Sequence, residues 1–466
     1  MTNAVKERIL NLISRDNEQY QDIVNFFLDY DVNEIEKTLR ADKIISNEIP
    51  KYKNNDLNFP ERLVDLERWI SQNHNSQCLN YSNYLERRRN GGKREFFQTV
   101  SEAYEFLYKV APVKRVDGSW LYSLTKHWND QEYRGLIQIY LEELGLGIRA
   151  KNHVCLFENL LTSHGLNQFL VNLGDEYYHQ AAVQLALAYA SSEFIPEILG
   201  FNLGYEQLPL HLLITNYELK ELGIDSRYFN LHITIDNYDN GHAKLALESI
   251  QKISRRYDDE YEFMKKLKAG FALNDAGLSS NTIIQNLDTE AMVLNILQKK
   301  AIIGRHMHNN RCVIANKTTN EWLSDNENVS LFVQVLKDNG WIRLNEDPSN
   351  SRFWNMLNDD GKMSGVFSDI EKAFIYDWIA GTESDKFSYQ VKPQLIEKFL
   401  DMDCIQSSHP NNLESLQHDI LGINNIKDQL SKLVLYLSPH YHSQEIGLWS
   451  SRKYVEILYP YLATRN

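Results

Sequence analysis

Cysteine is scarce in this chain of 466 residues, and its placement excludes several kinds of site. The four cysteines lie far apart, and no two of them form a C-x-x-C pair. They are Cys78, Cys155, Cys312 and Cys404. Zinc ribbons and iron–sulfur sites of the usual spacing use such pairs, and a disulfide scaffold needs cysteine at a higher density. The chain is therefore expected to reside in a reducing cytoplasm.

Long apolar runs and the common nucleotide-binding motifs are also missing. No run reaches the roughly 18 apolar residues of a membrane span, and residues 1–20 lack the apolar stretch and cleavage site of a signal peptide. Without a glycine-rich phosphate loop or a G-x-S-x-G elbow, neither a bound nucleotide nor a serine hydrolase is expected. The net charge of −14 argues against a nucleic-acid partner.

Helical periodicity is what the sequence contains in abundance. From about residue 96 to 250, apolar residues recur three and four positions apart, and strand-like alternation is scarce. This pattern predicts an all-α bundle over residues 91–272. An N-terminal helical extension is expected over 1–90, and a mainly helical C-terminal unit over 273–466.

Some smaller features have a local interpretation. Residues 46–62 are rich in asparagine and hold two prolines, which predicts a linker before a helix at 63–72. Residues 303–323 predict a short strand or hairpin, with His306 and His308 at the surface. Aromatic residues at helical spacing in the C-terminal unit are expected in its core rather than around a substrate pocket. They are Trp322, Trp341, Phe353, Trp354, Phe367 and Trp378.

The stretch "YFNLHITIDNYDNGHAKLA", residues 228–246, places two histidines and two aspartates among apolar residues. On a helix that turns about 100° per residue, His232, Asp236 and Asp239 lie within about 60° of one another. His242 lies about 80° from His232 and joins them only if the turn after Asp239 is irregular. Such groups are costly to bury unless they are paired or bind a metal, and imidazole with carboxylate suits Fe(II), Mn(II) or Zn(II).

Two further segments offer ligands for such a site. A glycine-broken helical stretch carries Glu142, Glu143 and His153, and a later apolar helical run carries Glu197 and Glu206. Helical bundles build two-metal carboxylate sites from Glu and His residues on several helices. Solvated helix faces and hydrogen-bonded core histidines explain the same residues, and the pattern alone leaves both interpretations open.

Four blocks of the sequence occur in an order that points to a family: "LEELGLGIRAKNHVCLFENLL", "GFNLGYEQLPLHLLITNYELKELGID", "YFNLHITIDNYDNGHAKLA" and "SRFWNML…GVFSDIE…DWIA". They resemble the iron-containing redox enzyme family, whose members are haem-oxygenase-like diiron oxidases. The resemblance extends from about residue 95 to 380. It implies a haem-oxygenase-like helical bundle and a set of metal ligands. These are Glu143, His153, Glu206, His232, Asp236 and His242.

The chain departs from the family pattern in two places, which leaves alternates open. Relatives often carry the first Glu and His about two turns apart on one helix, whereas here nine residues and two glycines intervene. Relatives also often place the last His three residues after the Asp, and that position is an aspartate here. The alternates are Asp239 for His242, Glu142 for Glu143 and Glu197 for Glu206.

The resemblance also implies an activity. It predicts an O2-dependent oxidoreductase that carries two iron ions per chain, Fe(II) or Fe(III), with manganese as an alternative in one site. The substrate would be a small molecule that undergoes N-oxygenation or C–C or C–H oxidation. Electrons would come from a ferredoxin or a flavoprotein reductase, and a homodimer is compatible with the family. The alternatives are a metal-free helical scaffold that binds a small molecule or a protein, and a cofactor-free hydrolase on the same fold.

Overall fold

The structure, a computed structural model, consists almost entirely of helices. Among the residues that it describes, the strands are β1 (Val313–Ile314) and β2 (Lys317–Thr318), which pair antiparallel. The predicted all-α class is therefore confirmed. None of the described helices is long and apolar enough to cross a membrane. The described residues are 18–53, 58–169, 172–235, 241–308, 311–387, 389 and 413–463.

The helices follow one another in four groups. The first is α2 (Tyr20–Leu28), α3 (Glu34–Tyr52) and α4 (Leu66–Arg89). The second is α5 (Val100–Lys114), α6 (Arg134–Glu143), α7 (His153–Ser163), α8 (His179–Tyr189), α9 (Ile195–Tyr205), α10 (Leu210–Glu221), α11 (Arg227–Ile235), α12 (His242–Ile253), α13 (Glu260–Ala272) and α14 (Ser280–Gln285). The third is α15 (Thr289–Gly304), α16 (Thr319–Trp322), α17 (Asn326–Asp338), α18 (Arg352–Leu357) and α19 (Asp369–Ala380). The fourth is α20 (Leu413–Gly422), α21 (Ile426–Val434) and α22 (Glu445–Ala463).

Short 3-10 turns connect these helices. Those nearest to the site are η2 (Ser119–His127), η4 (Gly145–Gly147), η5 (Arg149–Lys151) and η14 (Leu435–Leu437). Elsewhere they are η1 (Leu63–Asp65), η3 (Gln131–Tyr133), η6 (Leu166–Gln168), η7 (Asp175–Tyr178), η8 (Ser192–Phe194), η9 (Ser254–Arg256), η10 (Leu273–Asp275), η11 (Pro348–Asn350) and η12 (Gly381–Glu383).

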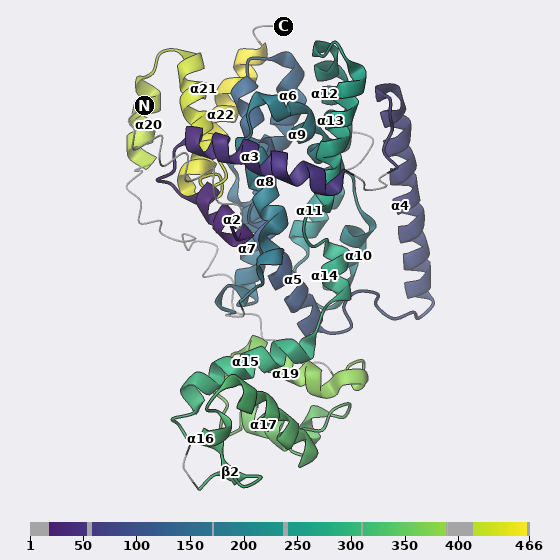
Figure 1. The fold of residues 1–466 in the computed structure, drawn as a ribbon, viewed down its shortest axis with the longest axis vertical. Coiled ribbons are helices and arrows are strands. Elements are labelled where there is room, and N and C mark those ends of the chain that lie inside the picture. Colours follow the sequence, from purple (N-terminus) through teal and green to yellow (C-terminus); the bar gives the residue numbers. More distant parts are fainter. Residues whose placement is uncertain are drawn as a thin grey trace.

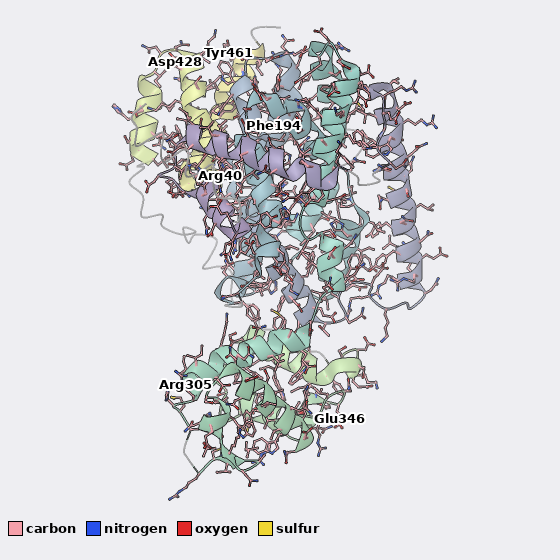
Figure 2. The ribbon with its side chains drawn as sticks, viewed as in Figure 1. Arg40, Phe194, Arg305, Glu346, Asp428 and Tyr461 are labelled. Atoms are coloured by element: carbon pink, nitrogen blue, oxygen red, sulfur yellow. The ribbon has the colours of Figure 1, made fainter. Side chains whose placement is uncertain are left out.

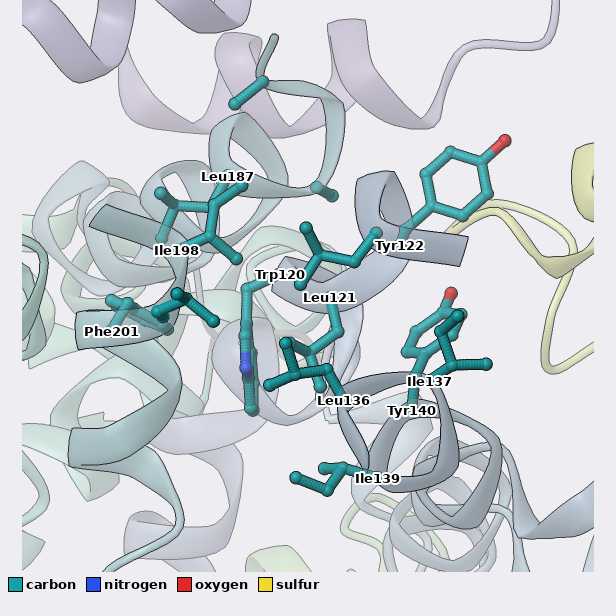
Figure 3. Packing of buried hydrophobic residues seen from close by; sticks show 14 of the residues in the cluster. Trp120, Leu121, Tyr122, Leu136, Ile137, Ile139, Tyr140, Leu187, Ile198 and Phe201 are labelled. Atoms are coloured by element: carbon teal, nitrogen blue, oxygen red, sulfur yellow. The ribbon is translucent and has the colours of Figure 1, made fainter. Parts of the chain in front are cut away.

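The first hydrophobic core joins the two ends of the chain. It contains α2, α3, α6, α8 and α9 together with α20–α22, and Figure 1 shows α22 beside α6. Trp120 lies at its centre, edge-on to Phe201, and donates from Nε1 to Asn202 Oδ1 at 2.9 Å (Figure 3). Tyr140 of α6 donates its hydroxyl hydrogen bond to Leu437 O and so ties the C-terminal helices to the bundle.

The second hydrophobic core joins α5, α7 and α11 to α15–α19. In Figure 1 the helices α15–α19 form a lower body, whereas α20–α22 lie in the upper body. Figure 2 marks the lower body with Arg305 and Glu346 and the upper one with Asp428 and Tyr461. Each core therefore contains residues from both sides of the expected domain boundary at residue 272. The expected division into 1–90, 91–272 and 273–466 stays a prediction.

The expected linker at 46–62 is wrong for its first part. The helix α3 runs through these residues to its end, with Pro50 in the last turn. Glu48 on this turn is buried and lies 2.9 Å from His179 Nε2. Because such tertiary contacts outweigh local propensity, the proline does not end the helix early. The helix expected at 63–72 exists and, as α4, is longer than predicted.

The expected hairpin is confirmed. β1 and β2 are joined by Ala315 and Asn316, whose φ angles of 49° and 67° are both positive, as in the tight turns that favour hairpins. His306 is exposed and His308 is half-buried, close to the surface position that the sequence predicts.

The aromatic residues of the C-terminal unit lie mainly in the second core, as expected. Trp322, Phe353, Trp354, Phe367 and Trp378 are buried. Trp341 is half-buried and, together with Phe353 and Phe367, also borders an apolar cavity of about 970 Å³ between α15, α17 and α18. None of the described residues around this cavity is a predicted metal ligand.

Candidate metal centre

Acidic and imidazole side chains from several helices meet inside the bundle. Two groups of described residues each place their ligand atoms within 4.8 Å of one another. The first is Asp117, Glu143, His153 and His232, and the second is Glu143, Glu206 and His242. All of these residues are buried. Because Glu143 belongs to both groups, the arrangement is that of two adjacent ligand sets that share one carboxylate, as in the two-metal sites of helical bundles.

A tight turn brings the end of α6 back to the start of α7. Gly145, Leu146 and Gly147 all have positive φ, and a Cβ on Gly145 would lie 2.4 Å from the backbone N of Asn152. Only a glycine fits this approach. The turn lets His153, the first residue of α7, place Nδ1 at 2.5 Å from Oε2 of the terminal Glu143 of α6. This geometry explains why the pair spans two helices rather than one.

Asp117 reaches the site from the turn between α5 and η2. Its Oδ2 accepts a hydrogen bond from the Tyr228 hydroxyl and lies 3.3 Å from His232 Nε2. The next residue, Gly118, has a φ of 75°, and a Cβ there would lie 2.7 Å from Glu143 Cβ. Asp117 was not among the predicted ligands, because this aspartate has no other candidate ligand near it in the sequence. The signal that was available is the Asp-Gly pair directly after a helix.

His232 of α11 is oriented by its own helix. Its Nδ1 donates to the Tyr228 carbonyl oxygen at 2.9 Å, because a carbonyl can only accept. This bond fixes the proton on Nδ1 and leaves the lone pair of Nε2 directed at the Asp117 side of the site. The imidazole is therefore held in the tautomer that a metal ligand needs.

His242 links the second group. It is the first residue of α12, α11 ends at Ile235, and residues 236–240 between the two helices fall outside the described residues. Its Nδ1 lies 3.0 Å from Oε2 of Glu206, the residue that caps α9, and its Nε2 lies 2.8 Å from Glu142 Oε2. Glu142 belongs to neither ligand group of the described residues and serves here as a hydrogen-bond partner of the imidazole.

Three predicted residues remain, namely Asp236, Asp239 and Glu197. Asp236 and Asp239 fall outside the described residues. Glu197 is buried on α9, nine residues before Glu206, which places it on the opposite face of the helix at about 100° per residue. It belongs to neither ligand group found in the described part of the chain. Burial raises the pKa of Glu197 to about 7.

Comparison with known proteins agrees with this geometry. Residues 104–274 match the iron-containing redox enzyme family. The resemblance is thus confirmed over a segment that contains every member of both ligand groups, and the match points to a haem-oxygenase-like helical fold. No curated protein and no solved structure matches the chain. We refer to residues 104–274 as the iron-redox segment.

Some buried polar atoms of the first ligand group lack the hydrogen bonds that buried polar atoms normally make. Glu143 Oε2 and both ring nitrogens of His153 have no hydrogen-bond partner within the described residues. Yet His153 Nδ1 and Glu143 Oε2 approach to 2.5 Å. Two ligand atoms that meet without a hydrogen bond fit a cation held by both, and imidazole with carboxylate suits iron.

Electrostatics also favour a cation in the iron-redox segment. Burial opposes the charged form of Asp117, but the Lys114 ammonium and the two nearby imidazoles hold the pKa of this carboxyl well below its usual range. Burial likewise opposes ionisation of Glu143, and the charge of His153 lowers its pKa. Burial alone would lower the pKa of His153, but Glu143 and Asp117 raise it to about 10. The carboxylates thus stay ionised only beside positive charge, whether a proton or a metal ion supplies it.

A cavity of about 240 Å³ opens onto the two ligand groups. Glu206 and His232 are among the ligands that face it, and Lys114 and His211 border it as well. Burial and the Lys114 ammonium lower the pKa of His211 to about 4, so this imidazole is neutral near pH 7. The iron-redox segment therefore offers a small, partly polar space for a substrate directly beside the ligand groups.

Proposed function

We propose that the chain is a non-haem diiron oxidase or oxygenase that uses O2 to oxidise a small molecule, by N-oxygenation or by C–C or C–H oxidation. The observation that carries this proposal is the shared Glu143, which joins two buried ligand groups into one site. The family match supports an oxidoreductase with iron, and the diiron arrangement is our own inference from the geometry.

Each iron would take its own ligand group. One would be held by Asp117, Glu143, His153 and His232, and the other by Glu143, Glu206 and His242. Asp236, which the family resemblance adds, would complete the set. When bound as Fe(II) or Fe(III), the pair would supply the redox chemistry that activates O2, and manganese in one position is part of the same proposal.

The protein's own groups would bind the metals, orient them and exclude water. Tyr228 would hold two of the ligands in place, since its carbonyl oxygen orients His232 and its hydroxyl donates to Asp117. The cavity beside the ligands would receive the substrate, with Lys114 and His211 as polar contacts. Electrons would come from a ferredoxin or a flavoprotein reductase, and we place the reaction in the cytoplasm.

Iron titration of matched variants tests the proposal. Glu206→Gln removes a carboxylate of the second ligand group, whereas Glu197→Gln changes a buried glutamate on the opposite face of the same helix. We expect anaerobic Fe(II) titration to give about two irons per chain for the wild type and for Glu197→Gln, and a loss of at least one for Glu206→Gln.

The opposite result separates the alternatives. A folded wild-type protein with no affinity for iron would contradict the proposal and favour a metal-free binding scaffold. Equal iron binding by the two glutamine variants would show that Glu206 is not a ligand.

A further inference from the structure

The C-terminal helices pack directly on the turn that carries Glu143 and His153. A Cβ on Gly147 would lie 2.4 Å from the carbonyl oxygen of Leu448 in α22. Arg452 of the same helix donates from Nη2 to Gly147 O at 3.2 Å. An element far outside the iron-redox segment is therefore built against the candidate metal centre.

Asn152 fixes the C-terminal chain next to His153. Its Nδ2 donates to Leu144 O at 3.4 Å and to His442 O at 3.3 Å. On the other side of His153, Cys155 Sγ donates to Ser443 O at 3.3 Å. The backbone at 442–443 is thus attached to Asn152, directly before His153, and to Cys155, two positions after it.

His442 presents a second unexplained imidazole at this place. The side chain is buried, at 1% exposure, and neither ring nitrogen has a hydrogen-bond partner within the described part of the chain. Its ring is close enough to Asp117, Glu143 and His153 for electrostatic interaction with all three. A neutral imidazole carries one N–H donor and one acceptor nitrogen, so the His442 ring can accept a hydrogen bond from a neighbouring histidine.

The three imidazoles of the ligand groups differ in the hydrogen-bond partner of the outer nitrogen, which is the ring nitrogen that would not bind the metal. A histidine that binds a metal through one nitrogen almost always donates its other N–H to a nearby acceptor. His232 donates to the carbonyl oxygen of Tyr228, and His242 has Glu142 beside it. His153 turns Nδ1 toward Glu143, and its Nε2 has no partner among the described residues.

We infer that His442 is the hydrogen-bond partner of His153: its acceptor nitrogen takes the outer N–H of His153, directly or through one bound water, and so orients His153 for metal binding. His442 is thus a positioning residue supplied by the C-terminal helices. The inference rests on the metal centre proposed above. It also accounts for two buried histidines whose ring nitrogens have no hydrogen-bond partner among the described residues.

Iron affinity of two His442 variants tests the inference. His442→Leu removes the acceptor, whereas the side-chain carbonyl oxygen of His442→Gln retains one. We expect anaerobic Fe(II) competition with a chelator to show a roughly 10- to 100-fold weaker affinity at one iron for His442→Leu. For His442→Gln we expect a loss of no more than about threefold. The matched control is His440→Leu, because His440 Nδ1 contacts the Tyr189 hydroxyl at 3.2 Å and lies in a different pocket.

The outcomes distinguish this inference from the proposed function. A wild-type protein that binds no iron would overturn both. Two irons in the wild type and an unchanged affinity in a folded His442→Leu variant would overturn the positioning role alone. An equal loss in the leucine and glutamine variants would also overturn it, since the acceptor would then not matter.

A second measurement covers the case in which His442→Leu does not fold. In zinc-loaded wild-type protein with 15N-labelled histidine, we expect a slowly exchanging Nε2–H resonance from His153. This resonance should shift in His442→Gln, because its acceptor changes from a ring nitrogen to an amide oxygen. A resonance that exchanges rapidly or does not move would contradict the inference.

Discussion

Gly118 is a position where one added methyl group should disturb the candidate metal centre directly. Its φ of 75° is a left-handed conformation, and an added Cβ would lie 2.7 Å from Glu143 Cβ and 2.9 Å from Glu143 Cγ. Since Glu143 Cβ is attached directly to α6, neither atom can move away without a shift of the helix or of the turn. The Gly118→Ala substitution should therefore displace the carboxylate that both ligand groups share.

The magnitude follows from two contributions. A non-glycine residue in the left-handed region costs about 1–2 kcal/mol, and an extra carbon forced into a packed interior costs about 1–3 kcal/mol. We expect the free energy of unfolding of the metal-free protein to fall by about 2–5 kcal/mol in Gly118→Ala. Iron stoichiometry should fall as well, because Glu143 moves.

Gly223 provides the matched control. It has a nearly identical φ of 73°, but no described atom lies within 4 Å of a Cβ built on it. Gly223→Ala should therefore lose only the conformational part, about 1–2 kcal/mol, and should bind iron like the wild type. Urea unfolding and anaerobic iron titration of both variants measure the difference. Equal stability losses with intact iron binding in both variants would refute the close approach of Gly118 to Glu143.

Two further predictions concern buried ionisable groups. Burial raises the pKa of Glu197 from 4.5 to about 7, so the folded state binds this proton more tightly than the unfolded state does. The resulting stability is complete below about pH 4.5 and is lost as the pH rises through 7, by an amount on the order of 3 kcal/mol. Glu197→Gln should flatten this part of a urea-unfolding pH profile, and an unchanged slope would count against the assignment. The Tyr228 hydroxyl donates to the buried carboxylate of Asp117. Tyr228→Phe should therefore lower the free energy of unfolding of the metal-free protein by about 1.5–3 kcal/mol, and a change below about 0.5 kcal/mol would show that this bond contributes little.

The helical class could be predicted from the sequence because its signal is local. Apolar periodicity places most helices, and Gly223 ends α10 in the conformation expected after a helix. The extent of α3 could not be predicted in this way. Its last turn is held by the contact of Glu48 with His179, and a contact over 131 positions leaves no local trace.

The candidate site was predictable where its residues stand in recognisable blocks. The structure brings Glu143 and His153 to within 2.5 Å of each other and places His242 beside Glu206. Asp117 could not be recognised in this way, because a single aspartate in a turn looks like the aspartate of any surface turn. Its role depends on a glycine that lets two backbones approach, which is a tertiary property.

The contribution of the C-terminal helices to the site could not be predicted from the sequence. Arg452 and Gly147 are 305 positions apart. The apolar periodicity of α22 predicts a helix but does not indicate that this helix packs on the turn at Gly147. His442 likewise has no neighbouring ligand in sequence. Its burial and the bond of its carbonyl oxygen to Asn152, next to His153, make it a candidate for the site.

The central claim is that one carboxylate, Glu143, joins two metal positions, and Mössbauer spectroscopy of the wild-type protein tests it most directly. After anaerobic loading with 57Fe(II) and oxidation, we expect about two irons per chain that are spin-coupled through the shared carboxylate. A single iron per chain, or two irons without magnetic coupling, would contradict the shared site.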